Sequence, residues 1–417
     1  MKILFITENF PPETNAAATR VYERAAYWVR WGHHVTVITS APNFPLGKLF
    51  PGYANRWRQT EDMTGIRVVR VKTYITPNRG VVRRTLDFTS FMASGFAASL
   101  FEDKPDLVCA TSPQFFAAVA GWASGAALGV PFVFELGDLW PASIAAVGAM
   151  RQGFLLRQIE RLELSLYRSS AAIVALTPAF KENLTGRGIA GGKIAVVLNG
   201  VDVWRYGPRE RDPGLAGRWG LDGRFVVGYV GTHGMAHGLV NVLDAAERLR
   251  EAADVRFLLV GAGADRDGLI AEAGRRGLDN VVFMPPQPKE SMPAVWSLCD
   301  VALVHLKNSP VFAGVIPSKM FEAMAMGLPV LLAAPDGEAG RILEADGAGM
   351  RVPAEDPAAL ADAVVRLKSD GAGRRAMAKR CLAAAGLHSR EHQAREMIRV
   401  FELAAAGRGG EAGAVSP

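Results

Sequence analysis

The chain has 417 residues, 49% of them apolar, which is enough for two or three domains with large hydrophobic cores. The formal net charge of +6 comes from a basic excess in the first 200 residues, but no basic–aromatic pattern typical of nucleic-acid binding accompanies it, so the composition argues against a nucleic-acid partner. The three cysteines, Cys109, Cys299 and Cys381, lie far apart and form no disulfide or metal-binding pattern, which indicates a reduced, cytosolic protein.

In the first half, short apolar runs predict β-strands that alternate with helix-like stretches. The run over residues 2–7 is too short for a signal peptide and two prolines follow it, so we interpret it as the first strand. A helix is predicted over residues 18–32. Further strands are predicted over residues 33–40, 66–74, 106–111, 131–136, 171–176 and 193–198. This alternation is typical of βα units in a parallel sheet.

Residues 107–134 contain no charged side chain, and the stretch is long enough to span a bilayer. It is interrupted by Pro113, Gly121, Gly125 and Pro131, however, and its pieces have the pattern of a strand, a helix and a second strand. Strands that are buried on both faces lose the alternation of apolar and polar residues. We therefore expect a buried βαβ unit here and not a transmembrane helix.

The second half repeats this alternation, with strands predicted over residues 225–231, 255–263, 280–286, 300–306, 329–334 and 348–353. A turn at Asn199-Gly200 and a polar, proline-containing segment separate the two halves. We therefore predict an α/β protein with two Rossmann-like, doubly wound parallel-sheet domains, residues 1–200 and 201–386, that face a cleft. A C-terminal helix over residues 387–406 should pack back on the first domain, and the glycine-rich residues 407–417 should be disordered.

The stretch GYVGTHGMAHGL, residues 228–239, follows the first strand of the second half. Gly231 has no Cβ, so backbone N–H groups can turn toward an anion, and a helix that begins near Gly238 would add the positive end of its dipole. An ordinary tight turn is the alternative. His233 and His237 have a zinc-binding spacing but lack a third ligand, so we expect hydrogen bonds to phosphate and no metal site.

The stretch IPSKMFEAMAMGLPVLLA, residues 316–333, predicts a helix that begins after Pro317. Lys319 and Glu322 are three residues apart and share one helical face. In a ligand site, Lys319 would meet a phosphate and Glu322 would accept hydrogen bonds from a ribose diol. A surface ion pair that contributes little to stability is the alternative.

Two loops of the first half also follow predicted strands. Glu13, Asn15 and Arg20 follow the first strand, where their side chains would bind sugar hydroxyls or phosphate. Asp138 and Trp140 follow the strand over residues 131–136, and a carboxylate beside an indole is either a sugar-binding pair or a capped turn.

These stretches together resemble the family 4 glycosyltransferases, which have the GT-B fold. The similarity is carried by FPPETNAAATR, APNFPLGK, GDLWPASI, LTPAFKENL, NGVD, GTHGMAHGL, IPSKMFEAMAMGLPV and DGEAGRIL. The bacterial branch that builds surface polysaccharides is the most similar, including the L-fucosamine transferases of O-antigen assembly. The resemblance implies retaining transfer of a sugar from a nucleotide diphosphate without a metal or other cofactor. The donor would bind to the C-terminal domain and the acceptor to the N-terminal domain, and Glu322 matches the ribose-binding carboxylate of the family.

The chain departs from the family at three positions. Many relatives carry an Arg and a Lys where this chain has Thr232 and His237, and the first of two paired glutamates is replaced by Gly314. We therefore assign Lys319 as the compensating cation. The donor set is Gly231, Thr232, His233, His237, Gly238, Lys319 and Glu322. The catalytic set is Asp138, Lys319 and Glu322.

The leading hypothesis is a retaining glycosyltransferase that uses a UDP-sugar, acts on a polyprenyl-diphosphate-linked or saccharide acceptor, and works in the cytoplasm at the inner membrane. Eight basic residues between Arg56 and Arg84, with the apolar residues 85–101 behind them, motivate the membrane contact, although a buried Rossmann helix is an equally good interpretation of that segment. A UDP-sugar epimerase of the same architecture and a non-catalytic nucleotide-sugar-binding protein are the competing hypotheses.

Overall fold

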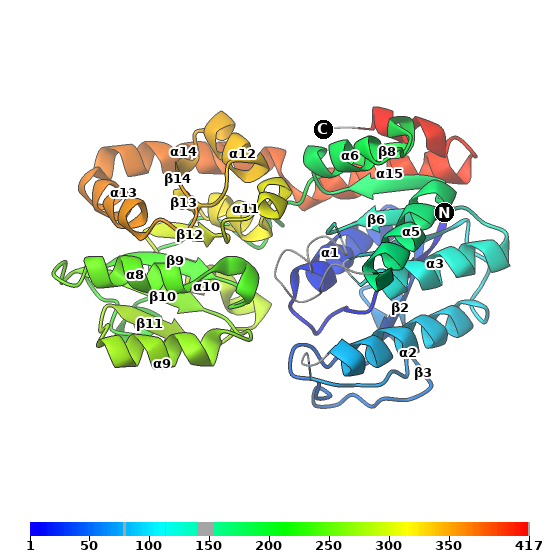
Figure 1. Ribbon diagram of the computed structural model, residues 1–417, viewed down its shortest axis with the longest axis horizontal. Coiled ribbons are helices and arrows are strands. Elements are labelled where there is room, and N and C mark those ends of the chain that lie inside the picture. Colours follow the sequence, from blue (N-terminus) through cyan, green and yellow to red (C-terminus); the bar gives the residue numbers. More distant parts are fainter. Residues whose placement is uncertain (78–80, 113, 140–153, 416–417) are drawn as a thin grey trace. The chain divides into compact units, whose positions relative to one another are not determined.

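The computed structural model describes residues 1–77, 81–112, 114–139 and 154–415, and these fold into two compact units. Unit 1 comprises Met1–Leu198 and Arg390–Pro417, and unit 2 comprises Asn199–Ser389 (Figure 1). The chain thus leaves unit 1 at the turn expected from the sequence and returns to it after residue 389.

Within the described residues, unit 1 contains an eight-stranded sheet with the order β3-β4-β2-β1-β5-β6-β7-β8. All neighbouring strands are parallel except β3 and β4. The strands are β1 (Lys2–Ile6), β2 (His34–Ser40), β3 (Arg58–Met63), β4 (Ile66–Val71), β5 (Leu107–Thr111), β6 (Phe132–Leu136), β7 (Ala172–Ala175) and β8 (Ile194–Val196). Seven of them were predicted, whereas β3 was missed because RQTEDM is a polar edge strand without an apolar run.

Helices cover both faces of the unit 1 sheet. Their bounds are α1 (Ala16–Arg30), α2 (Val81–Ser99), α3 (Phe115–Leu128), α5 (Phe154–Ser169), α6 (Pro178–Gly186) and α15 (Arg390–Ala405), with a 3₁₀ turn η1 (Gly191–Lys193). One apolar cluster joins α1 and α15 to the sheet, and a second joins α2, α3, α5 and α6 to the opposite face. The segment after the basic run is therefore the buried Rossmann helix α2, whose Phe91 is fully buried.

The uncharged stretch forms β5, α3 and β6, as predicted. Among the described residues, no helix has the length and hydropathy needed to cross a bilayer. Cys109, Cys299 and Cys381 are buried and unbridged.

The C-terminal residues belong to unit 1. In α15, the Ala394 carbonyl oxygen accepts a 2.9 Å hydrogen bond from the indole of Trp28, and the ring of Phe401 lies 5.3 Å from the Trp28 ring. The prediction that residues 407–417 are disordered is wrong for the described part, because Gly409–Ala414 form a 3₁₀ helix, η5. Gly409 fits there because a Cβ at this position would lie 2.2 Å from the Ala171 carbonyl oxygen. The glycines thus permit close packing rather than disorder.

The described residues of unit 2 contain a six-stranded parallel sheet with the order β11-β10-β9-β12-β13-β14. The strands are β9 (Phe225–Val230), β10 (Val255–Val260), β11 (Val281–Met284), β12 (Val301–His305), β13 (Val330–Ala333) and β14 (Gly349–Val352), and all six were predicted. Numbered within the unit, this is the Rossmann order 3-2-1-4-5-6. The chain reverses direction across the sheet between β9 and β12, and ligands of such sheets bind beyond the strand ends at that switch point.

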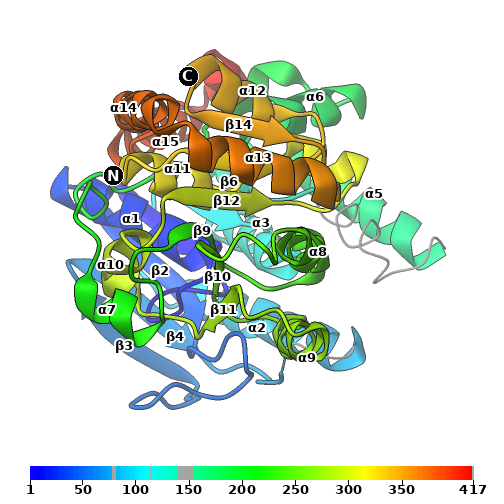
Figure 2. The ribbon, with the colours of Figure 1, turned by 90° about the vertical axis from the view of Figure 1, so that its left-hand side faces the viewer.

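The helices of unit 2 divide between the two faces of this sheet. Figure 2 shows α8 (Val240–Arg248) and α9 (Arg266–Arg276) on one side, and α10 (Met292–Trp296), α11 (Ser318–Ala325) and α14 (Gly371–Leu387) on the other. The remaining elements are α7 (Pro213–Arg218), α12 (Glu338–Asp346), α13 (Pro357–Ser369), η2 (Met235–His237), η3 (Lys289–Ser291) and η4 (Pro310–Gly314). The loop after β9 and the start of α11 both lie at the switch point.

Candidate functional site

The glycine loop, residues 231–239, and the first turn of α11 meet directly in unit 2. Gly231 has a φ of +142°, a conformation that side-chain-bearing residues rarely adopt. A Cβ on Gly231 would lie 2.7 Å from Lys319 Nζ. The missing side chain therefore makes room for the Lys319 amine, and the structure brings together these two residues of the predicted donor set.

The Lys319 amine is buried and has no hydrogen-bond partner among the described residues. Its Nζ lies 3.7 Å from the centre of the Tyr229 ring, which is close enough for a cation–π interaction. Burial lowers the pKa of Lys319 to about 7, and the nearby Glu322 carboxylate opposes this shift. An amine without a counter-ion contact is a strong candidate for binding an anion.

Tyr229, the next-to-last residue of β9, lies between these groups. Its hydroxyl donates a 2.8 Å hydrogen bond to the Thr232 carbonyl oxygen. The rings of His233 and His237 lie 5.8 and 5.9 Å from the Tyr229 ring. Thr232 itself is exposed, at the position where many relatives carry an Arg.

His237 is held by a reciprocal contact with β12. Its Nδ1 donates to the His305 carbonyl oxygen at 3.2 Å, and His305 Nδ1 donates to the His237 carbonyl oxygen at 2.6 Å. Burial, together with the nearby Lys319, lowers the pKa of His237 to about 3. His237 is therefore neutral near pH 7 and carries its proton on Nδ1. It supplies no positive charge, although it occupies the position of the relatives' Lys.

His233 is fully buried, and neither ring nitrogen has a hydrogen-bond partner among the described residues. Its Cδ2 lies 3.5 Å from the position a Cβ on Gly261 would take, so the ring fills space beneath the glycine loop. Burial, together with Arg266 and Lys319, lowers the pKa of His233 to about 4. That His233 donates a hydrogen bond to a phosphate stays a prediction, and its ring is neutral near pH 7.

The helix after the glycine loop begins two residues later than predicted. Gly238 has a φ of +53° in the left-handed region, and α8 starts at Val240 without a side-chain cap. In its first turn, the N–H groups of Asn241 and Val242 already donate to the carbonyl oxygens of Gly238 and Leu239, at 3.1 and 3.0 Å. The N-terminus of this nine-residue helix, which carries the positive end of the helix dipole, lies two residues after Gly238.

Glu322 lies one turn further along α11, and the structure places two partners on it that sequence reasoning missed. Lys289 Nζ lies 3.0 Å from Glu322 Oε1, and the Trp296 indole nitrogen lies 3.5 Å from Oε2. Both charged side chains are more than four-fifths buried, so this is not a solvated surface pair. Nothing in the stretch PQPKESMP links Lys289 to Glu322, because the two residues are 33 positions apart in the sequence.

Gly314, at the position of the relatives' first paired glutamate, ends η4. This position therefore supplies only backbone groups. Among the described residues, no three His, Cys, Asp or Glu side chains gather closely enough to hold a metal ion.

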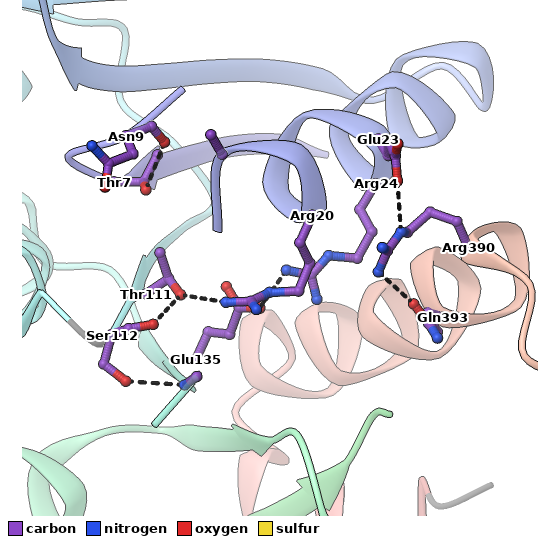
Figure 3. A network of polar contacts seen from close by, with 12 residues as sticks. Thr7, Asn9, Arg20, Glu23, Arg24, Thr111, Ser112, Glu135, Arg390 and Gln393 are labelled. Carbon is purple, nitrogen blue, oxygen red and sulfur yellow. Dashed lines mark hydrogen bonds and ion pairs between the residues drawn. The ribbon is translucent and has the colours of Figure 1, made fainter. Parts of the chain in front are cut away.

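In unit 1, the predicted acceptor residue Arg20 forms buried contacts within the protein (Figure 3). Arg20 Nε donates to Glu135 at 3.0 Å and Arg20 Nη2 donates to Thr111 Oγ1 at 3.3 Å, while Arg24 pairs with the same carboxylate. Burial alone would raise the pKa of Glu135, but Arg24 and Arg20 lower it to about 2. The Arg20 side chain is 6% exposed and is already paired with Glu135, and its contact with the acceptor stays a prediction.

Glu13 and Asn15 also hold the local backbone. Glu13 Oε1 accepts hydrogen bonds from the backbone N–H groups of Asn43 and Phe44 at 2.7 and 2.8 Å. Asn15 caps α1 by accepting from the Ala18 N–H at 3.0 Å. Glu13 is 2% exposed, and its contact with sugar hydroxyls stays a prediction.

Asp138 lies two residues beyond β6 and is half-buried, at the carboxyl edge of the unit 1 sheet. Its carbonyl oxygen accepts a 3.4 Å hydrogen bond from Ser112. Trp140, its predicted partner, lies outside the described residues.

Comparisons with known proteins agree with this architecture. Residues 15–200 match the family described as "Glycosyl transferase 4-like domain", and residues 224–370 match "Glycosyl transferases group 1". The chain is 26% identical to the putative colanic acid biosynthesis glycosyl transferase WcaI of Escherichia coli, over 78% of this chain and 82% of that protein. It is 28% identical to a GDP-mannose-dependent alpha-mannosyltransferase of Mycobacterium tuberculosis, over 88% of each chain.

Solved structures share the fold. The structure of Anabaena HepE in complex with UDP and glucose superposes with a TM-score of 0.72 and 19% identity, over 96% of this chain and 99% of that one. Two Rossmann-like units, the matches to both family descriptions, and relatives matched over more than four-fifths of their length agree. The chain therefore belongs to the family 4 glycosyltransferases, which have the GT-B fold.

Proposed function

We propose that this glycosyltransferase transfers a sugar, with retention of configuration, from a nucleotide diphosphate to a saccharide or polyprenyl-diphosphate-linked acceptor in surface-polysaccharide synthesis. The observation that carries the proposal is the meeting of Gly231, Lys319 and Glu322 at the switch point of the unit 2 sheet. A buried amine without a hydrogen-bond partner lies there beside a glycine loop, with a carboxylate one helical turn away. These groups suit a diphosphate and a ribose.

Each of these residues would have a separate role in binding and catalysis. The N–H groups of Gly231, His233 and His237 already donate to backbone carbonyl oxygens. Lys319 and the remaining N–H groups of the glycine loop, including that of Gly238, would hold the diphosphate, and Glu322 would accept hydrogen bonds from the ribose hydroxyls. Charge that develops on the leaving diphosphate would be stabilised by donors already in position. In a front-face route the leaving phosphate takes the acceptor proton, so no protein nucleophile is required. Asp138, in unit 1, would orient the acceptor.

The nucleotide base is proposed to be uracil. The UDP complex of HepE supports this choice, and the GDP-mannose-dependent relative makes guanine the alternative to test. The sugar itself is left to the donor screen, in which the L-fucosamine derivatives suggested by the sequence belong beside glucose and mannose.

The decisive experiment supplies UDP-sugars and GDP-mannose together with a lipid extract as the acceptor source. Nucleoside diphosphate release that depends on the extract, with an α-configured product from an α-configured donor, supports retaining transfer. Conversion of the nucleotide sugar without an acceptor would favour the epimerase hypothesis. Tight donor binding without turnover in any combination would favour a non-catalytic binding protein.

We also propose that unit 1 docks on the anionic inner face of the cytoplasmic membrane. Leu46 and Trp57 are 69% and 77% exposed, and Lys72 Nζ lies 4.5 Å from the centre of the Trp57 ring. The exposed Lys48 and Arg56 lie in the same loop, and residues 43–58 contain no acidic side chain. Exposed indole and leucine side chains among cations suit an anionic lipid interface.

Sedimentation with phosphatidylglycerol-containing vesicles tests this docking surface. The Leu46→Ser, Trp57→Ser double variant should remain in the supernatant, whereas Trp204→Ser, which removes an 81% exposed indole from unit 2, should sediment like the wild type. Equal sedimentation of all three proteins would refute the assignment.

A further inference from the structure

The amine of Lys319 lies where positive charge is disfavoured. Nζ is buried and has no hydrogen-bond acceptor among the described residues. Lys319 is also in the first turn of α11, where the helix dipole is positive. The face of Tyr229, 3.7 Å away, attracts a cation but cannot replace the hydrogen bonds that an ammonium makes in water.

The groups that face this amine do not form an ion pair or hydrogen bond with it among the described residues. Glu322 lies one turn further on, and its carboxylate already contacts Lys289 and Trp296. His233 and His237, from the glycine loop, are neutral above pH 5 because burial lowers their pKa values to about 4 and about 3. His305 of β12 is neutral for the same reason, with a pKa of about 4. Burial raises the pKa of Tyr229 well above its ordinary value, so that side chain is also uncharged.

We propose that donor binding is coupled to protonation of Lys319: above neutral pH the empty site holds a mostly neutral amine, and the entering diphosphate draws a proton from solvent onto Nζ. The inference rests on the proposed function and assigns a protonation step to the same site. No other bond changes, because the nitrogen lone pair accepts the proton and the resulting ammonium pairs with the phosphate oxygens. The chain thereby gains at position 319 the cation that is missing at positions 232 and 237.

The coupling has a measurable pH signature. Burial lowers the pKa of Lys319 to about 7, so above that pH an increasing fraction of the empty sites must acquire a proton before they pair with the ligand. Affinity should then fall by about fivefold between pH 7 and 8, and by close to tenfold for each further pH unit. Because the three histidines and Tyr229 keep their charge state between pH 6 and 9, they do not contribute to this slope.

Calorimetry with UDP and with GDP, in two buffers of different ionisation enthalpy, counts the protons directly. At pH 8 the terminal phosphate of the free nucleotide is already ionised, since its pKa is about 6. We expect uptake of close to one proton per nucleotide bound, and a loss of affinity of about tenfold between pH 7.5 and 8.5.

Three variants assign the proton to its site. Lys319→Arg keeps a permanent charge and should bind nucleotide without proton uptake, and Lys319→Met should bind at least tenfold more weakly, also without uptake. Lys379→Met, which removes an exposed lysine of α14, should match the wild type in both respects. Circular dichroism confirms that each variant is folded.

The outcomes separate the inference from the function on which it rests. Nucleotide binding without proton uptake, or uptake that persists in Lys319→Met, would overturn the inference and leave the donor site intact. If neither UDP nor GDP binds the wild-type protein, both the inference and the proposed function are refuted.

Discussion

At the scale of single residues, the two units differ in whether a buried charged side chain contacts a partner of opposite charge. In unit 1, Glu135 is fully buried but pairs with Arg20 and Arg24. In unit 2, the Lys319 amine is buried without any such partner among the described residues. A paired buried charge is costly to break, whereas an unpaired one is costly to keep. We therefore interpret the Glu135 cluster as support for unit 1 and Lys319 as a group retained for a ligand.

Lys319→Met should stabilise the ligand-free protein near pH 7. Because the folded-state pKa of about 7 lies below the ordinary 10.5, the unfolded chain binds a proton that the folded chain lacks between these values. Wild-type stability therefore rises with pH through this window. The variant should gain about 2 to 4 kcal/mol at pH 7, and the gain should shrink as the pH approaches 10. Urea unfolding at pH 7 and pH 9 measures this, and a less stable variant at pH 7 would contradict it.

Glu135→Gln should destabilise unit 1 by about 3 to 5 kcal/mol, since two buried guanidinium groups lose their shared counter-charge. The pKa of Glu135 is lowered to about 2, so this contribution is complete above pH 4.5 and is lost as the pH falls toward 2. Denaturant unfolding of wild type and variant should therefore converge in acid. Glu391→Gln, at an exposed pair with Arg395, serves as the control and should change stability by less than about 0.5 kcal/mol. Equal losses in the two variants would refute the assignment.

At the scale of elements, the glycine loop and α15 show how local sequence sets the position of functional groups. The loop runs from β9 to α8 and is fastened to β12 by the His237–His305 pair and by a 2.9 Å hydrogen bond from the Lys307 N–H to the Ala236 carbonyl. A loop held this way loses little further conformational entropy on binding a ligand.

Gly231→Ala should weaken nucleotide binding by at least about tenfold, because its Cβ would lie 2.7 Å from Lys319 Nζ and displace the amine. Gly234→Ala is the matched control in the same loop. Its Cβ would meet only Thr232 Cγ2, at an ordinary 3.5 Å, and its φ of −130° suits any residue. Isothermal titration with UDP compares the two. A variant at Gly231 that binds like the wild type would show that the amine is not part of the site.

Phe401→Ala should lower the stability of unit 1 by about 3 to 5 kcal/mol, since its ring is fully buried against Trp28. Leu86→Ala, which truncates a 51% exposed side chain of α2, should have little effect. Hydrogen exchange of unit 1 peptides in denaturant reports on this unit separately from unit 2. Unchanged protection in Phe401→Ala would mean that α15 does not stabilise the unit.

The strands and helices with a strong apolar pattern could be predicted from the sequence. The side-chain contacts within the candidate site could not be predicted. Buried strands such as β9 and β12 are continuous apolar runs, whereas the polar edge strand β3 has no such signal. The glycine-rich composition of the η5 segment predicts disorder, because composition does not reveal which glycines pack closely against another part of the backbone. Likewise, Lys319 and Glu322 followed from one helical turn, but the Lys289 partner and the His237–His305 pair depend on tertiary contacts between distant segments.

At the scale of the whole molecule, the chain divides its chemistry between two Rossmann-like units. Unit 2 has the strand order 3-2-1-4-5-6 and carries the proposed nucleotide groups at its switch point. Unit 1 carries the basic excess and the exposed Leu46 and Trp57. We therefore propose that unit 2 binds the donor and that unit 1 contacts the acceptor and the membrane.

The central claim, that unit 2 binds a nucleoside diphosphate through Lys319 and Glu322, is tested most directly by calorimetric titration of UDP and GDP into the wild type and into Glu322→Ala. Glu247→Ala, at an exposed pair with Arg250, is the control. We expect the wild type and Glu247→Ala to bind one of the two nucleotides with the same affinity. Glu322→Ala should bind that nucleotide at least about tenfold more weakly. Absence of binding to the wild type, or an unchanged affinity in Glu322→Ala, would contradict the account.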